Sequence, residues 1–117
     1  MKFFLTETKT YIGYKVVAYN GKRAVSIYNM DKEISLNIGG YEIDPKGLYL
    51  GTSRKFCINY YTGLSDDYEE GIGGYQDMLL TYEYSIDDLL EGFPDDSDGE
   101  VKVKKAKLVN KEILPGI

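Results

Sequence analysis

Two strand-forming runs on either side of Asn20-Gly21 constrain the fold of this chain more than any other feature. Residues 11–19 are rich in aromatic and β-branched side chains, and residues 22–28 continue with a similar composition. Asn-Gly is the strongest short signal for a β-hairpin, because a type I′ turn requires a positive φ at both central residues. The sequence therefore predicts an antiparallel hairpin over residues 11–28.

Further strand-like runs follow along the chain. Strict alternation of apolar and polar residues over 33–38 predicts a half-buried strand that Gly39-Gly40 ends. Residues 44–47 are typical of a turn, with Pro45 preset for its second position. The remaining predicted strands are residues 48–50 and 78–84, followed by a final strand or pair of strands from residue 100 to about residue 113.

Two helices are expected beside these strands. Thr52 or Ser53 can cap a helix that runs to about Tyr61. Ser85 and Asp88 form a compact capping box, which predicts a short helix over residues 86–90. The buried stripe of the longer helix is expected to consist of Phe56, Cys57, Tyr60 and Tyr61.

Together these elements predict one domain over residues 1–117. Its expected class is α+β, with a mainly antiparallel twisted sheet of five to six strands, one medium helix and one short helix.

The composition limits the chemistry that this chain can perform. It holds twelve tyrosines and no tryptophan, which suits strands and wet protein surfaces alike. Histidine, the commonest general base and metal ligand, is absent, and Cys57 is the single cysteine. We therefore expect no disulfide, no metal and no cofactor, and a buried, unreactive Cys57 thiol.

The first residues argue against export. Residues 1–5 are mostly apolar, but residues 6–10 are polar and charged, so no signal-peptide core or membrane span follows. We expect a cytoplasmic protein, and a lone cysteine fits a reducing compartment.

Two loops are similar to ligand-binding motifs but lack residues that those motifs require. If Gly99 were the sixth position of a calcium loop, Pro94 would be the first and Lys105 the twelfth, and neither supplies a carboxylate. The glycines of residues 71–74 are not followed by Lys-Ser/Thr, and the acids beside them would repel a phosphate. Both segments are interpreted as solvated turns or loops.

Residues 46–53, followed by a predicted helix that ends in Tyr60-Tyr61, resemble the second conserved block of ADP-ribosyltransferase-like folds. In that block a Gly-Ile/Leu-Tyr strand and a Ser or Thr lead into a helix that lines the nicotinamide pocket. The chain departs from the family in having no His, no Arg on residues 11–19 and no Glu-x-Glu pair, so Glu83 or Glu100 would have to take the place of the late acid. The alternative function implied is a small nucleotide-handling enzyme whose pocket would hold Tyr49, Ser53, Arg54, Tyr60 and Glu83.

Most of the chain is similar to short, uncharacterised proteins encoded by bacteriophages. The matching pieces are Gly13-Tyr14-Lys15-Val16, Gly47-Leu48-Tyr49 with Tyr60-Tyr61, and Gly99-Glu100-Val101 leading to Val109. This resemblance names no activity. It implies a viral or mobile-element origin and, by association, a role in disabling host machinery.

Acidic and basic residues are segregated along the sequence. Between Lys55 and Lys102 there are thirteen acidic residues and no lysine or arginine, whereas the remainder holds fourteen basic and six acidic residues. If folding preserves this separation, the molecule has an acidic face and a basic face.

The acidic stretch is a candidate docking surface for a host protein with a basic surface, such as the nucleic-acid groove of a defence nuclease. Carboxylates would steer the encounter and tyrosine rings would anchor it. The alternative is a solvated face that only keeps the protein soluble. Direct nucleic-acid binding is less favoured, because residues 102–107 place only some of their lysines on one face, and self-association stays open. The candidate partner-binding residues are Asp66, Asp67, Tyr68, Glu69, Glu70, Tyr75, Asp87, Asp88, Asp95, Asp96 and Asp98.

Overall fold

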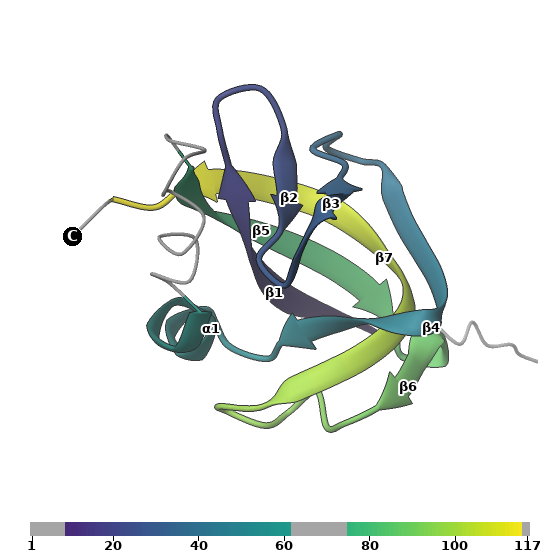
Figure 1. The fold of residues 1–117 in the computed structure, drawn as a ribbon. Helices are drawn as coiled ribbons and strands as arrows, with labels where there is room; N and C mark the ends of the chain where they lie inside the picture. The colour runs from purple at the N-terminus through teal and green to yellow at the C-terminus, as the bar shows by residue number, and fades with distance from the viewer. Residues whose placement is uncertain (1–8, 62–74, 116–117) are drawn as a thin grey trace, which may run out of the picture.

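The computed structural model describes residues 9–61 and 75–115, and antiparallel strands dominate it (Figure 1). The strands are β1 (Thr10–Tyr19), β2 (Ala24–Ser26), β3 (Asn29–Ile34), β4 (Tyr41–Gly51), β5 (Gln76–Ser85), β6 (Leu89–Glu91) and β7 (Glu100–Ile113). The α-helix α1 (Arg54–Tyr61) lies between β4 and β5 in the sequence, and the 3-10 turn η2 (Ile86–Asp88) lies between β5 and β6.

The sheet closes on itself through β1, β5, β7 and β4. β1 pairs with β5 along its whole length, and β5 pairs with the C-terminal part of β7. The other edge of β7 pairs with β4, and a single pairing between Tyr14 and Gly51 joins β4 back to β1. β2 and β3 extend the sheet from β1, and β6 pairs with β7. The result is a small closed sheet with a two-strand extension.

Two glycines allow β1 and β4 to meet. A Cβ atom added at Gly13 would lie 2.8 Å from the Cβ of Leu50, and one added at Gly51 would lie 3.2 Å from the Cβ of Cys57. Both distances are shorter than ordinary van der Waals contacts, so a side chain at either position would push β4 away from β1 or α1 away from β4. The closure of the sheet therefore depends on two residues without side chains.

Alternation along the strands sends apolar side chains to opposite faces. Val17, Leu50, Leu80 and Tyr82 are fully buried in the main core cluster, to which six of the strands contribute. On the opposite face, the buried Cys57 brings α1 against Val16, Leu79 and Leu114. A third cluster beside β2 contains Ala18, Val25, Ile27 and Tyr75.

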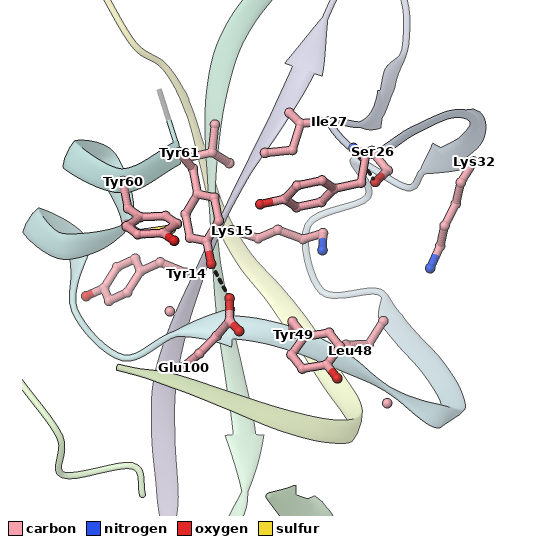
Figure 2. A pocket seen from close by; sticks show the side chains of 15 residues that line it. Tyr14, Lys15, Ser26, Ile27, Lys32, Leu48, Tyr49, Tyr60, Tyr61 and Glu100 are labelled. Atoms are coloured by element: carbon pink, nitrogen blue, oxygen red, sulfur yellow. Dashed lines mark hydrogen bonds between the residues drawn. The ribbon is translucent and has the colours of Figure 1, made fainter. Parts of the chain in front are cut away.

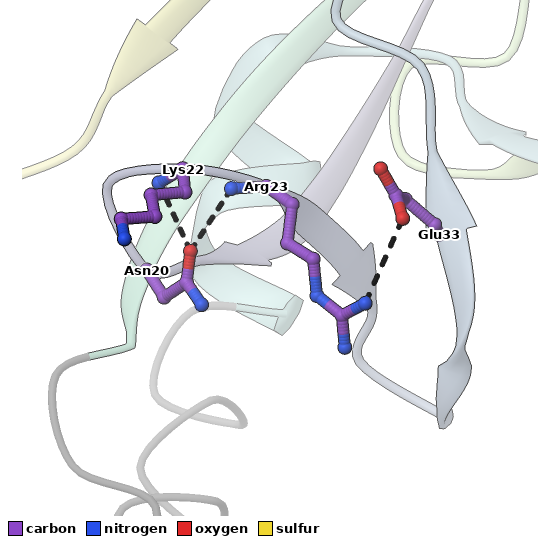
Figure 3. Close-up of polar contacts among 4 residues, drawn as sticks. All are labelled: Asn20, Lys22, Arg23 and Glu33. Atoms are coloured by element: carbon purple, nitrogen blue, oxygen red, sulfur yellow. Dashed lines mark hydrogen bonds and ion pairs between the residues drawn. The ribbon is translucent and has the colours of Figure 1, made fainter.

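The predicted hairpin is confirmed, but its turn differs from the prediction. The β1–β2 pairing ends at Tyr19 and Ala24, so four residues form the loop. The side-chain Oδ1 of Asn20 accepts hydrogen bonds from the backbone N–H groups of Lys22 and Arg23 (Figure 3). Gly21 has a φ of 94°, whereas Asn20 does not adopt a positive φ. The predicted type I′ turn is therefore wrong, because Asn20 caps the loop with its side chain instead.

The strand predicted over residues 33–38 is placed too late in the sequence. The strand is β3, which ends at Ile34, and Ile38 is 54% exposed. The backbone N–H of Gly39 donates to the oxygen of Leu108, and that of Gly40 donates to the oxygen of Asn37. The second bond is a turn contact that occupies the Asn37 oxygen, which a continued strand would need, and the first joins this turn to β7.

The predicted turn at residues 44–47 lies inside one long strand. The pairing of β4 with β7 passes from Ile43 and Lys105 to Leu48 and Val103, which leaves residues 44–47 as an irregularity. Gly47 has a φ of 109° there. The prediction of a turn that precedes a new strand is therefore wrong, because β4 continues through residues 44–47 with an irregularity in its pairing.

The two predicted helices have different outcomes. Ser53 Oγ accepts a hydrogen bond of 3.0 Å from the backbone N–H of Phe56, which confirms the N-cap of α1. The short helix over residues 86–90 is wrong: Ser85 caps only the turn η2, and residues 89–91 pair with β7 as β6. The antiparallel sheet with one medium helix is thus confirmed, while the strands of the described part number seven rather than five or six.

Candidate ligand-binding cavity

A cavity of about 510 Å³ lies between α1, β4 and the β2–β3 extension, with β1 as its floor (Figure 2). This volume falls within the range of roughly 300–1,000 Å³ that small-molecule sites occupy. Residues from β1, β2, β3, β4, α1 and the start of β7 line it, so the closed sheet and the helix have to assemble before the cavity exists.

The cavity arises because one edge of β1 has no strand beside Lys15 and Val16. β5 covers the opposite edge of β1 completely. On the free edge, β4 pairs with Tyr14, whereas β2 pairs only from Val17 onward. The two neighbours of β1 therefore separate around Lys15, and the gap between them is the cavity.

Lys15 extends its side chain into this cavity (Figure 2). Burial lowers the pKa of its amine, and the positive charge of Lys32 lowers that pKa further. None of the ion pairs found within residues 9–61 and 75–115 includes Lys15. The cavity thus contains a partly desolvated amine for which the described residues offer no carboxylate at salt-bridge distance.

Five tyrosines line the cavity together with the two lysines. The rings of Tyr60 and Tyr61 meet edge to face at 4.9 Å, and those of Tyr28 and Tyr61 do so at 6.4 Å. Tyr28, Tyr49 and Tyr60 are 71%, 52% and 63% exposed, so their rings retain accessible surface at the mouth of the cavity. The tyrosines that line the cavity are Tyr14, Tyr28, Tyr49, Tyr60 and Tyr61.

A carboxylate lies on the α1 side of the cavity. The hydroxyl of Tyr61 donates a hydrogen bond to Oε2 of Glu100 (Figure 2). Burial raises the pKa of Tyr61, and this hydrogen bond raises it further. The backbone N–H of Thr52 donates to the oxygen of Gly99 at 2.9 Å, which fixes the start of β7 beside the end of β4. Glu100 is therefore held at a defined place between β4 and α1.

Cys57 closes the cavity beneath α1 and is fully buried, in agreement with the prediction of an unreactive thiol. Burial raises the pKa of this thiol to about 11, and the nearby Lys15 only partly opposes that shift. Because the thiolate is the reactive form, Cys57 is a packing residue near neutral pH.

The residues of the alternative enzyme pocket do not all meet. Tyr49 and Tyr60 line the cavity, but Ser53 caps α1 and Arg54 pairs with Glu112. Glu83 pairs with Lys107 at 3.6 Å and lines a smaller hollow beside β7. The structure therefore does not bring Glu83 to Tyr49.

Sequence reasoning missed the two lysines of the cavity. A signal for Lys15 was available, since it interrupts an otherwise apolar and aromatic run in β1. Lys32 gave no such signal, because it follows an aspartate in a polar stretch. Tyr61 was noted in the sequence as a helix-stripe residue. Glu100 was named as one of two candidates for the late acid, and the structure places it in the same cavity as Tyr49 and Tyr60.

The candidate partner-binding residues are dispersed. Five of them, Asp66, Asp67, Tyr68, Glu69 and Glu70, lie outside the described residues. Tyr75 is 6% exposed and belongs to the third core cluster, so its ring is not on the surface. Asp88 is half-buried, and Asp87, Asp95, Asp96 and Asp98 are exposed.

A second hollow of about 530 Å³ lies between the β1–β2 loop and the residues after β3. It is more open to solvent than the first, and Arg23 pairs across it with Glu33 at 3.6 Å (Figure 3). Both of these side chains are more than half exposed. The hollow therefore lacks the enclosure and the desolvated charge of the first cavity.

Comparison of the chain with protein-family models, curated proteins and solved structures found no match in any of the three. Within the described residues, no group of three or more acidic or cysteine side chains could hold a metal ion. No helix among them is long and apolar enough to cross a membrane.

Proposed function

We propose that this protein binds a small planar organic anion in the cavity above β1. The observation that carries this proposal is Lys15, a partly desolvated amine in a cavity of ligand size lined by tyrosine rings. The proposal concerns binding and includes no catalytic step.

The charges of the cavity favour an anion. Lys15 and Lys32 both line it, and its carboxylate, Glu100, accepts a hydrogen bond from Tyr61. Lys32 also pairs with Asp44 at 3.8 Å, so Lys15 is the cavity lysine without an ion pair in the described residues. Placing an amine in a low-dielectric site costs free energy unless an opposite charge accompanies it. A bound anion would supply that charge through charge-assisted hydrogen bonds, which are stronger than neutral ones.

The rings favour a flat ligand. Aromatic groups prefer offset-stacked or edge-to-face contacts with tyrosine, and the partly exposed rings of Tyr49 and Tyr60 offer surfaces for both. A phosphate or carboxylate attached to an aromatic ring would satisfy the lysines and the tyrosines together.

The test is to titrate the protein with 1-naphthyl phosphate and to follow binding by calorimetry. Lys15→Met should weaken this binding on the order of tenfold or more, because it removes a charge-assisted contact. Lys22→Met is the matched control: Lys22 is an exposed lysine of the β1–β2 loop outside the cavity (Figure 3), and its loss should leave the affinity unchanged.

Neutral 1-naphthol separates charge from shape. It should bind wild type and Lys15→Met with similar, weaker affinity, because it makes ring contacts alone. Equal affinities of wild type and Lys15→Met for the phosphate would overturn the proposal, as would the absence of naphthyl phosphate binding to the wild type.

A second candidate function is docking on a basic protein surface, such as the nucleic-acid groove of a host defence nuclease, as expected for a phage-type inhibitor. The observation that favours it is a group of exposed carboxylates in the loop before β7. None of the ion pairs recorded for the described part of the chain includes Asp95, Asp96 or Asp98. These acids are therefore free to steer a cationic partner.

A further inference from the structure

The cavity has opposite charges on its two sides. Lys15 and Lys32 come from β1 and β3, whereas Glu100 lies beside α1 at the start of β7 (Figure 2). Tyrosine rings occupy the space around them. A ligand that spans this cavity would place an anionic group at one end and meet a carboxylate at the other.

Glu100 restricts the chemistry of that second end. Its contact with Tyr61 uses one oxygen, Oε2. A carboxylate has about four acceptor positions and, when ionised, no donor. Because Glu100 still has acceptor capacity and cannot donate, the ligand edge that reaches it has to carry hydrogen-bond donors, and on a planar heterocyclic edge these are N–H groups. A carbonyl oxygen at that edge would face the negatively charged carboxylate of Glu100 and would find no hydrogen-bond donor there.

A planar edge with N–H donors, joined to an anionic group, describes a nucleotide whose base carries an amino group. Bases stack on tyrosine rings without regard to their identity, so the rings alone would not distinguish one base from another. The charged groups at the two ends would supply the orientation and the selection.

We propose that this cavity selects nucleotides whose base has an exocyclic amino group, with Glu100 accepting from that amino group while Lys15 and Lys32 hold the phosphate. Glu100 is then the specificity-determining residue. This inference rests on the proposed function, because it requires that the cavity bind planar anions at all.

The test compares two matched pairs of nucleoside monophosphates by calorimetry. Adenosine and inosine monophosphate differ at two adjacent positions of the base edge: adenine has an exocyclic amino group beside an unprotonated N1, whereas hypoxanthine has a carbonyl beside an N1–H. Cytidine and uridine monophosphate form the corresponding pyrimidine pair, with N3 in the place of N1. Wild type should prefer the amino member of each pair on the order of tenfold. In Glu100→Gln the preference should fall to within about threefold, because an amide both donates and accepts.

A fold check and a control variant accompany this test. The amide in Glu100→Gln can still accept from Tyr61, so circular dichroism should show an intact fold. Glu112→Gln changes another carboxylate of β7, one that pairs with Arg54 outside the cavity, and it should keep the wild-type preference.

Four outcomes would overturn the inference. Equal affinities within both pairs would show that the cavity does not select bases with an amino group. Binding of 1-naphthyl phosphate without binding of any nucleotide would show that nucleotides are not its ligands. Both outcomes would leave planar-anion binding intact. A preference that persists in Glu100→Gln would assign the selection to another residue. If neither the nucleotides nor 1-naphthyl phosphate bind, the proposed function fails together with this inference.

Discussion

Lys15 shows how one residue can oppose the stability of the fold that surrounds it. Its sequence neighbours, Tyr14 and Val16, pack against the cluster beneath α1, and its amine is carried into the cavity with them. Burial disfavours the charged amine, and Lys32 adds a second unfavourable charge. A residue that lowers stability at a site of partly desolvated charge is typical of functional positions, where activity and stability are in conflict.

Replacing Lys15 by Met should therefore stabilise the ligand-free protein near pH 7, by about 1 kcal/mol. The pKa of Lys15 is lowered from 10.5 in the folded state. Between the lowered value and 10.5 the unfolded state binds more protons than the folded state, so the contribution of Lys15 to the free energy of unfolding rises with pH in that window.

Urea denaturation of wild type and Lys15→Met at several pH values checks this expectation. The advantage of Lys15→Met should shrink as the pH approaches 10.5. Taking the difference between the two proteins cancels the titration of groups that do not interact with Lys15, such as Tyr61. Cys57 does not cancel, because Lys15 lowers its pKa, so both proteins should also carry Cys57→Ala. A difference that stays constant with pH would show that Lys15 is solvated in the folded protein.

Among the elements, the contact between β1 and β4 decides the shape of the molecule. It consists of one pairing, Tyr14 with Gly51, and the backbone of β1 approaches Leu50 at Gly13. The same contact holds β4 where α1 can pack on it, because Gly51 faces Cys57. The same short contact between β1 and the end of β4 thus determines the closure of the sheet, the position of α1 and one wall of the cavity.

Gly13→Ala should destabilise the protein by about 1–3 kcal/mol, because the new methyl group overlaps the Leu50 side chain. Its Cβ would lie 2.8 Å from both Cβ and Cδ1 of Leu50. In a Leu50→Ala background the Cδ1 contact is gone, so Gly13→Ala should cost less there, by about 0.5 kcal/mol or more. Chemical denaturation of the four proteins of this cycle measures the difference. Strictly additive effects would show that β1 and β4 do not press together at Gly13.

At the scale of the whole molecule, folding mixes part of the charge that the sequence separates. Glu83 pairs with Lys107, and Glu91 pairs with Lys102, so acids of β5 and β6 neutralise bases of β7. Among the described acids of residues 56–101, those that are exposed and outside these ion pairs lie in η2, in the loop before β7 and at Glu100. The acidic face is therefore smaller in the described residues than the sequence suggests.

If this remaining group docks on a basic protein, Asp95→Asn/Asp98→Asn should weaken the interaction on the order of tenfold, and added salt should weaken it as well. Asp31→Asn/Glu33→Gln removes the same charge from β3 and should have no effect. The measurement is a pull-down from host lysate at low and high salt, followed by a titration of the captured protein. A partner that both variants retain equally, or no partner, would leave these acids as a solubility feature.

Local patterns in the sequence predicted the elements whose conformation is set by interactions between residues close in the chain. The apolar and aromatic runs in β1 and β5 form strands, as does β7, in which apolar residues alternate in part with lysines. Ser53 caps α1 because a hydroxyl three residues before a free N–H suffices for a cap. Where the local sequence favoured two conformations about equally, the prediction from sequence was wrong. Residues 89–91 follow a good capping residue, yet they form β6 because β7 offers them a ladder of backbone hydrogen bonds.

The sequence by itself determined a mainly antiparallel sheet with one helix and a buried cysteine, since periodicity, capping and turn chemistry act between residues that are close in the chain. Only the tertiary structure decided that the sheet closes through Tyr14 and Gly51 and that Lys15 faces a cavity with Lys32, Tyr49 and Glu100. Strand order depends on which distant edges pair, and no local pattern records that choice. The cavity lies where two partners of β1 diverge, so it exists only once those pairings have formed.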